Sequence, residues 1–438
     1  MRSVPTWLTR MLPESRVARR LSVQSVLYAF GDGVFTTGNA VYFTQIVGLS
    51  AAQVGLGLSL SGLAVLALSV PMGRVADRYG ARRMWALGAL LEAQLYLCYP
   101  FIHGFSPFLL LLTAFSVVAT VGGAGRGAYT IGIFPREERV RNQAFLRAAL
   151  NIGFTLGALG GGLALATDSH DVIRMVPVFS ALVLAANAYL ISRLPDSRAH
   201  GRPDAEPHGP ADSRLHEQPG AAPSPERGSS PKALKNRGYV ATSVLSGIAG
   251  THWVLLLVVI PLWLVERTDA PHWVLAWLFG TNTVLAVLFQ VPAARGMNTV
   301  TGALRGVRLA TGFMVVSCFL VAITGDTIGW VSVALLLVGH MTVTGAELFE
   351  SAATWGFMSE LSDPYRRGEY QGVWGMGGRI TNILGPATYT WLALNHGTVG
   401  WVVIASTIVL AAALLHPAVR SAERFLVTHE LDVSRAPA

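Results

Sequence analysis

The chain has few charged residues, few cysteines and almost no lysine. Charged residues make up 13% of its 438 residues, roughly half the share in soluble proteins, which argues against an ordinary soluble domain. The two cysteines, Cys98 and Cys318, both lie in apolar runs, so neither a disulfide framework nor a cysteine-based metal site is expected. No His-Glu-x-x-His, Gly-x-Ser-x-Gly or phosphate-binding glycine motif occurs, which argues against common hydrolases and ATP-driven transport.

Long apolar runs dominate the sequence instead. Hydrophobic residues make up 52% of the chain, and a run of about 20 such residues forms a helix that crosses a hydrocarbon core of roughly 30 Å. We predict an all-α membrane protein with twelve transmembrane helices in two pseudo-symmetric six-helix bundles. The expected spans are about 22–46, 52–72, 84–103, 107–134, 143–166, 173–193, 238–265, 272–293, 306–325, 329–358, 370–394 and 398–416.

A change of composition divides the chain into two halves. Residues 195–236 are rich in Pro, Gly, Ser, Asp, Arg and His, and they contain too little apolar surface to bury a core. We expect this segment to be a disordered linker. It separates an N-terminal bundle, residues 22–194, from a C-terminal bundle, residues 237–417. Residues 1–21 and 418–438 form polar ends.

The distribution of basic residues predicts the orientation. With the N-terminus inside, only Arg174 and Arg267 of the 33 lysines and arginines fall in outer turns, and nearly all others fall in inner segments. Basic residues favour the cytoplasmic side of a membrane. We therefore expect a multi-pass protein of the cell membrane with both ends and the linker in the cytoplasm. Because the net charge of +8 is explained by topology, we do not expect a nucleic-acid partner.

The stretch Gly73–Arg83, with the sequence GRVADRYGARR, lies between the second and third expected spans. It resembles the signature loop of the major facilitator superfamily, Gly-x-Leu-Ala-Asp-Arg-x-Gly-Arg-Arg-Arg. Val75 replaces the leucine, and Ala81 replaces the first basic residue after the second glycine. The resemblance implies a secondary transporter whose two halves rock about a site between them.

It also implies a conformational latch, whose acid Asp77 meets the positive N-terminal end of the eleventh span near Gly368–Gly372. The latch residues are Gly73, Asp77, Arg78, Gly80, Arg82 and Arg83.

Ionisable residues inside spans are the best functional pointers, since each costs about 2.5–3.5 kcal/mol at the centre of a helix. Asp32 lies in the first span, and Phe35 and Asn39 follow it at helical spacing. We favour Asp32 as a site for a proton or a cationic substrate, because a desolvated carboxyl group binds a proton more readily than one in water. A salt bridge between Asp32 and Arg126 in the fourth span is the second reading. Arg126 resembles the single arginine in the fourth helix of drug–proton antiporters. Glu92 in the third span has no assigned role.

The second half contains further polar residues within spans. We expect Glu347 to line the cavity, and Glu350 to form a structural pair with Arg379. His252 and Trp253 could supply a lid or a stacking contact. Arg147, just inside the fifth span, is expected to be a structural charge on the cytoplasmic side.

Four glycines in the fifth span, Gly153, Gly157, Gly160 and Gly161, have two interpretations. They resemble the antiporter motif Gly-x-x-x-Gly-Pro-x-x-Gly-Gly, with Ala158 in place of the proline. Equally, glycines at this spacing allow close packing of helices without any further role.

The leading hypothesis is a proton-coupled exporter of a small amphipathic or cationic compound, such as a drug or antibiotic. A proton-coupled importer of an organic solute is the alternative, and an intramembrane enzyme or receptor is a third class. We expect no cofactor, since the proton gradient would supply the energy. The expected partners are the lipid bilayer and the transported compound, and we expect the chain to work as a monomer.

Overall fold

The computed structural model describes residues 13–167, 169–195 and 231–429. Most of the predicted linker and the outer parts of both polar ends lie outside the described residues. The described part of the chain is helical and contains no strand. This agrees with the all-α prediction.

The first half consists of helices packed in one bundle. Serine side chains begin two of them: Ser15 accepts a hydrogen bond from the amide of Ala18, and Ser50 forms a capping box with Gln53. The elements are α2 (Arg16–Val41), continued by a π-helical turn (Tyr42–Ile46), α3 (Ala51–Tyr79), α4 (Ala81–Cys98), continued by a 3₁₀ turn (Tyr99–Phe101), α5 (Phe105–Ile133), α6 (Arg139–Ala166) and α7 (His170–Ser192).

The second half forms another bundle. Its first predicted span is broken into several pieces between Arg237 and Arg267, and its last helix contains two segments joined at Gly397, where the backbone has φ 55° and ψ −132°. The elements are α8 (Arg237–Ala249), α9 (His252–Val254), a π-helical turn (Leu255–Val259), α10 (Ile260–Arg267), α11 (Val274–Ala293), α12 (Val300–Ile323), α13 (Trp330–Glu360) and α14 (Arg367–Thr428).

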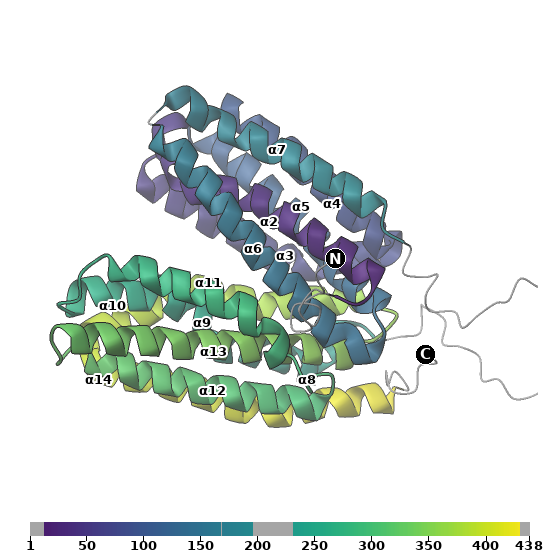
Figure 1. The fold of residues 1–438 in the computed structure, drawn as a ribbon. Coiled ribbons are helices and arrows are strands. Elements are labelled where there is room, and N and C mark those ends of the chain that lie inside the picture. Colours follow the sequence, from purple (N-terminus) through teal and green to yellow (C-terminus); the bar gives the residue numbers. More distant parts are fainter. Residues whose placement is uncertain (1–12, 168, 196–230, 430–438) are drawn as a thin grey trace, which may run out of the picture.

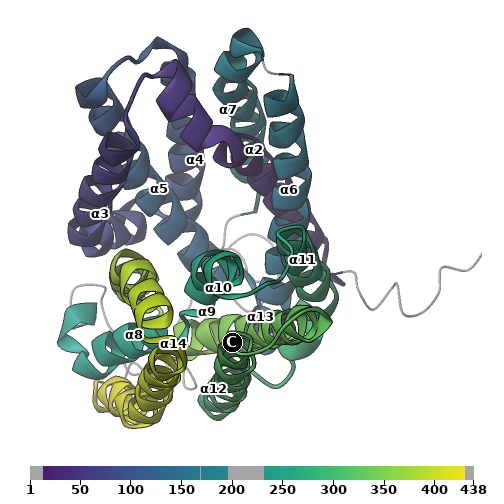
Figure 2. The ribbon, with the colours of Figure 1, turned by 90° about the vertical axis from the view of Figure 1, so that its left-hand side faces the viewer.

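The two bundles meet at one end and diverge toward the other. Figure 1 shows the first half above the second, with contact on the right and separation on the left. Figure 2, seen from the diverging side, shows the first half, drawn in purple to teal, above the second half, drawn in green to yellow. We call the meeting side, where α3 contacts the start of α14 and the start of α6 contacts the end of α13, the closed end.

Eight helical stretches in the described chain are long and apolar enough to cross a membrane. One is Arg367–Thr428, which contains both segments of α14, and one is Arg237–Arg267, which contains the broken first span of the second half. Trp277–Ala293 is a shorter apolar helix. A multi-pass membrane protein is therefore supported, and the number twelve stays a prediction.

Several helices extend beyond the apolar runs that predicted them. α2 begins at Arg16, within the predicted polar end, and α14 continues to Thr428, where Ala422 and Leu426 are buried. The supposed loop Gly73–Arg83 is helical except at Gly80, whose φ of 98° separates α3 from α4. Residues 231–236, predicted to belong to a disordered linker, include a 3₁₀ turn in which Ala233 is fully buried.

The glycines of α6 lie against α2. A Cβ at Gly153, Gly157 or Gly161 would come within 2.3–2.4 Å of the carbonyl oxygens of Val26, Phe30 and Val34, respectively. Because backbone atoms cannot yield as a flexible side chain can, these three positions require glycine. Gly160 differs, since its nearest neighbour is a side-chain atom of Val34 at 3.6 Å, an ordinary contact distance. The structure therefore supports the helix-packing interpretation for three of the four glycines.

Candidate functional site

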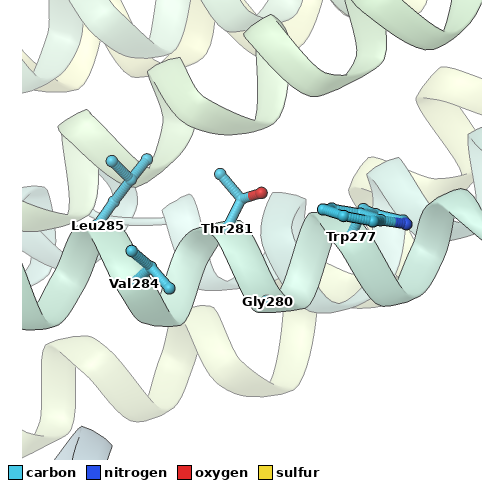
Figure 3. Close-up of a pocket in the computed structure, with 5 residues that line it drawn as sticks. All are labelled: Trp277, Gly280, Thr281, Val284 and Leu285. Atoms are coloured by element: carbon cyan, nitrogen blue, oxygen red, sulfur yellow. The ribbon is translucent and has the colours of Figure 1, made fainter.

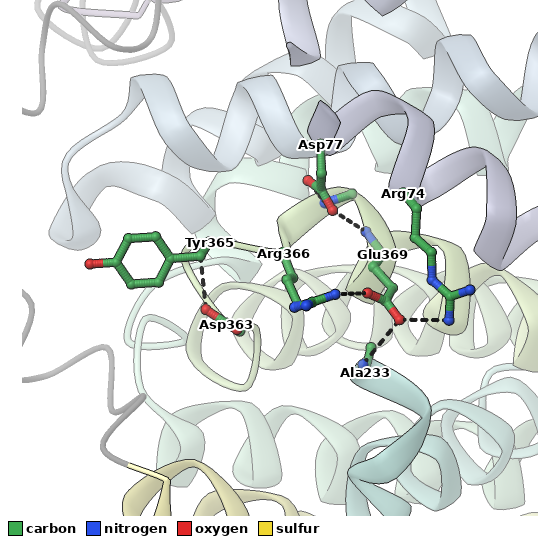
Figure 4. A network of polar contacts seen from close by, with 8 residues as sticks. Arg74, Asp77, Ala233, Asp363, Tyr365, Arg366 and Glu369 are labelled. Atoms are coloured by element: carbon green, nitrogen blue, oxygen red, sulfur yellow. Dashed lines mark hydrogen bonds and ion pairs between the residues drawn. The ribbon is translucent and has the colours of Figure 1, made fainter. Parts of the chain in front are cut away.

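At the closed end, Asp77 of α3 lies against the N-terminus of α14 (Figure 4). Its carboxylate oxygens accept hydrogen bonds from the backbone N–H groups of Gly368 at 2.7 Å and Glu369 at 2.8 Å. The first amides of a helix lack partners within the helix and carry partial positive charge. The structure thus places Asp77 where the resemblance implied, as a link between the two halves.

Glu369 forms the centre of a second group of contacts in the same place. Its carboxylate, which is fully buried, is 3.0 Å from Arg74 Nη2 and 2.9 Å from Arg366 Nη1, and it accepts a hydrogen bond from the amide of Ala233 at 3.2 Å. Arg74 comes from the first half and Arg366 precedes α14. A buried carboxylate needs such partners, because desolvation without them is costly.

The backbones of α3 and α14 approach each other closely here. A Cβ at Gly73 would come 2.1 Å from the carbonyl oxygen of Gly368, and one at Gly372 would come 2.4 Å from that of Ser69. Only glycine allows this distance between the helices. The approach brings Asp77 within hydrogen-bond range of the α14 amides.

The other predicted latch residues do different things. Arg78 is exposed and lies over the ring of its neighbour Tyr79, with 5.6 Å from its Cζ to the ring centroid. Arg82 donates a hydrogen bond to the carbonyl of Leu194 within the first half, and Arg83 is exposed. Of the six predicted residues, Gly73 and Asp77 lie directly against the second half. Sequence reasoning missed Arg74, although it lies inside the motif.

A second charged contact joins the halves at the closed end. Arg136 forms an ion pair with Glu360 at the end of α13, and Arg139 donates a hydrogen bond to Ser359 Oγ at 3.3 Å. Asn298 also donates a hydrogen bond to the carbonyl of Glu137. The basic turn before α6 therefore links the first half to the end of α13, as the α3 motif links it to the start of α14. The many charged residues of this turn were the sequence feature that could have predicted this contact.

Deeper in the molecule, Arg147 of α6 pairs with Glu347 of α13. Arg147 Nη2 lies 3.2 Å from Glu347 Oε1, and Asn282 of α11 donates a hydrogen bond to Glu347 Oε2 at 3.0 Å. The Glu347 residue is 7% exposed. Arg147, expected to be a structural charge, therefore links the halves. Glu347, expected to line the cavity, is its ion-pair partner.

A cavity of about 270 Å³ lies beside this ion pair. Glu350 is its central acid: the carboxylate accepts a hydrogen bond from Thr354 Oγ1 at 2.7 Å and lies 3.9 Å from His252 Nδ1. The cavity lies between α6, α8, α9, α13 and α14 and combines acidic, basic and aromatic side chains. Those side chains include Arg147, His252, Trp253, Glu350, Trp355 and Trp374.

The predicted pair of Glu350 and Arg379 is wrong. Arg379 lies on a neighbouring face of α14, and its Nη2 donates a hydrogen bond to Thr120 Oγ1 of α5 at 3.3 Å. His252 and Thr354 are the partners of Glu350. His252 and Trp253, by contrast, line the cavity as expected.

The residues predicted around Asp32 separate in the structure. Phe35 is buried in an aromatic cluster, with ring centroids 5.2 Å from Tyr96 and 5.0 Å from Tyr99, so it does not line the cavity between the halves. Asn39, one turn further along α2, is half-buried. Asp32 is half-buried and lies within electrostatic range of Glu92 in α4.

Arg126 does not pair with Asp32 in the described structure. Its Nη2 donates a hydrogen bond to Ser25 Oγ at 3.3 Å, and its Cζ lies 5.9 Å from the ring centroid of Tyr28. The second reading of Asp32, as a salt-bridge partner, is therefore not what the structure shows. Asp32 and Glu92 form a pair of acids inside the first half.

A further cavity, of about 420 Å³, lies along α11 and is mainly apolar. Figure 3 shows its lining side chains on a single helix, with Trp277 at one end and Leu285 at the other. Trp277 is 64% exposed. One helix supplies the whole lining of this cavity, whereas both halves contribute side chains to the cavity beside Glu350.

The profile of the Major Facilitator Superfamily matches residues 21–386. The chain belongs to this superfamily. Membership indicates a membrane transporter rather than an enzyme. The chain is similar to proteins called multidrug resistance protein MdtH: it is 25% identical to that of Enterobacter sp. strain 638, over 88% of this chain and 89% of the relative, and 23% identical to that of Shigella boydii, over 85% of each.

Solved facilitator structures share the fold. The human organic anion transporter MFSD10 superimposes with a TM-score of 0.63 and 16% identity, covering 92% of this chain and all of that one. A bacterial homologue of the iron transporter ferroportin, in an outward-facing state, gives a TM-score of 0.67 at 12% identity, covering 92% of this chain and 99% of that one. Sequence identity at this level supports the fold alone. The closed end and the cavity are described from the contacts of this chain itself.

Proposed function

We propose that this facilitator exports small amphipathic cations in exchange for protons by alternating access. The observation that carries the proposal is the cavity beside Arg147 and Glu347, where Glu350 lies among tryptophan side chains. Indole faces attract both apolar groups and cations, and a carboxylate nearby favours a positive ligand. Such a lining suits a compound that is apolar with one positive charge. The tryptophans are Trp253, Trp355 and Trp374.

Of the two acids in this region, Glu350 is the one that we propose to bind the cation. Glu347 already faces the permanent cation of Arg147, whereas Glu350 contacts the hydroxyl of Thr354 and the imidazole of His252. A bound cation would therefore add the most to Glu350. His252 lies close enough to exchange its contact with Glu350 for one with the ligand.

Asp32 is the proposed proton site. It belongs to a different set of helices from the substrate cavity, and its acidic neighbour Glu92 is 6% exposed. In this proposal the proton and the substrate bind separately and are coupled through the movement of the halves.

The names of the relatives favour export over import, since they are called multidrug resistance proteins. We propose that the closed end faces the cytoplasm, as the basic turns there predict, so that this conformation is open to the outside. The energy source is the proton gradient without a bound cofactor. The partners are the lipid bilayer and the exported compound, and the chain acts as a monomer.

The test uses the full chain in a pump-deficient bacterial strain and in proteoliposomes with an imposed pH gradient. In cells we expect increased tolerance to lipophilic cations. In proteoliposomes we expect the cation to move in the direction opposite to that of the protons. Glu350→Gln should weaken cation binding at least tenfold. Asp32→Asn should abolish gradient-driven transport but retain binding, and Asp326→Asn, in an exposed turn, should change neither.

Two results would contradict parts of this proposal. Greater intracellular accumulation of the compound would indicate an importer. Full gradient-driven transport by Asp32→Asn would remove Asp32 from the coupling mechanism.

A further inference from the structure

A separate cavity of about 150 Å³ lies between α3, α5 and α14. It adjoins residues 371–379 of α14, on a face neighbouring the one that lines the tryptophan-rich cavity. Both halves of the protein contribute to its lining. Its polar side chains are Ser69, Thr120, Gln371 and Arg379.

The second half supplies N–H donors without acceptors to this cavity. Arg379 Nε and Gln371 Nε2 are buried and have no hydrogen-bond partner in the described part of the chain, and the Gln371 residue is only 9% exposed. Buried donors without partners are rare in folded proteins, because each carries a desolvation cost. Two such donors beside one cavity indicate that a bound ligand accepts their hydrogen bonds.

The charge of the cavity is positive. Arg379 has no carboxylate partner among the described ion pairs, and its guanidinium contacts the neutral hydroxyl of Thr120. The hydroxyls of Ser69 and Thr120 donate to the carbonyls of Val65 and Ser116, both at 2.7 Å, so their lone pairs add no net charge. A cation is excluded by the guanidinium, and an acceptor with one negative charge fits both the donors and the size.

We propose that this cavity binds a small monovalent anion, either a halide such as chloride or a carboxylate. The anion accepts hydrogen bonds from Arg379 and Gln371 and neutralises the charge of the guanidinium. This inference does not rest on the export of cations, because the site lies apart from the cavity proposed for them.

The anion also joins the two halves. Ser69 and Thr120 belong to the first half, whereas Gln371 and Arg379 belong to the second, and α3 and α14 meet nearby at Ser69 and Gly372. Separation of α3 and α5 from α14 dismantles the site. Since a ligand shifts the population toward the state that binds it best, the anion stabilises the conformation with the closed end shut.

The experiment measures chloride binding to the purified full-length protein by the excess line width of the ³⁵Cl NMR signal. We expect Arg379→Gln and Gln371→Leu to reduce the excess line width of the wild-type protein at least threefold. Arg379→Lys, which keeps the charge but lacks the Nε–H group, should retain part of it. Arg308→Gln, at an exposed position of α12, is the matched control and should broaden the signal like the wild type.

Acetate distinguishes the two sources of anion. If chloride is the ligand, the line broadening depends on Arg379, and acetate at equal ionic strength does not remove it. If a carboxylate is the ligand, acetate displaces chloride or raises the unfolding temperature in chloride-free buffer, and Arg379→Gln abolishes that effect. The proposal is overturned if wild type, Arg379→Gln and Gln371→Leu respond identically to both anions. Unfolding curves of each variant show whether it is folded.

Discussion

Asp77 and Gly368 are 291 positions apart in the sequence, yet the carboxylate of one accepts a hydrogen bond of 2.7 Å from the backbone amide of the other. Because an amide at a helix N-terminus carries partial positive charge, the contact combines a hydrogen bond with electrostatic attraction. It fixes α3 of the first half against the start of α14 in the second.

The first prediction concerns the charge of Asp77. Asp77→Asn keeps the shape of the side chain but removes the charge, and should weaken closure by about 1–2 kcal/mol, roughly tenfold in the population of the closed end. Spin labels on the exposed residues Arg83 and Arg424 would report this as a broader, longer distance distribution across the closed end. Asp326→Asn serves as a control, and an unchanged distribution for Asp77→Asn would show that the contact does not contribute to closure.

The second prediction tests the close approach at Gly73. Gly73→Ala places a Cβ about 2 Å from the carbonyl oxygen of Gly368 and must push α3 away from α14. Transport should fall at least tenfold while membrane expression is kept. Gly55→Ala, on the same helix but with no atom within 4 Å of its Cβ, should transport normally. Equal activity of the two variants would argue against a required contact at Gly73.

The third prediction concerns packing within the first half. Gly157→Ala brings a Cβ to 2.3 Å from the carbonyl oxygen of Phe30, and should destabilise the protein by about 1–3 kcal/mol. Gly162→Ala, in the same helix but with open space around it, is the matched control. Thermal unfolding in detergent measures the difference, and similar midpoints for both variants would exclude a close α2–α6 contact at Gly157.

The fourth prediction concerns the ion pair of Arg147 and Glu347. Either Arg147→Gln or Glu347→Gln leaves one charge without its partner and should reduce transport and stability, by roughly 2 kcal/mol for the loss of the arginine. The double variant should be less impaired than the sum of the two changes, because neither charge is then left alone. A double-mutant cycle on unfolding temperature and transport rate measures the coupling. Strict additivity would mean that the two charges do not interact.

The sequence predicted the helical membrane fold well because that fold follows from the lengths of apolar runs. It predicted helix ends less well, because α2 begins before its apolar run and α14 continues beyond its own, in both cases through polar residues. Helix ends beyond an apolar run are stabilised by caps and tertiary contacts. Ser15 at the start of α2 and the buried Leu426 near the end of α14 are examples.

Within the candidate site, the sequence predicted which residues share one face of a helix, but not which faces of two different helices contact each other. The spacing of Gly153, Gly157 and Gly161 defines a stripe on one helix, and the structure shows that stripe in contact with α2. Glu350 and Arg379, however, lie on different helices, and nothing in a single sequence fixes the rotation of one helix relative to another. Arg379 therefore contacts the first half, where its partner Thr120 is neutral.

The buried carboxylate of Glu369 contacts Arg74 of the first half, Arg366 just before α14, and the amide of Ala233 in the segment that enters the second half. The place where the chain passes into its second half is therefore fastened to the same spot that must release during each transport cycle. A reporter group attached near Lys232 would sense every opening of the protein without touching its cargo.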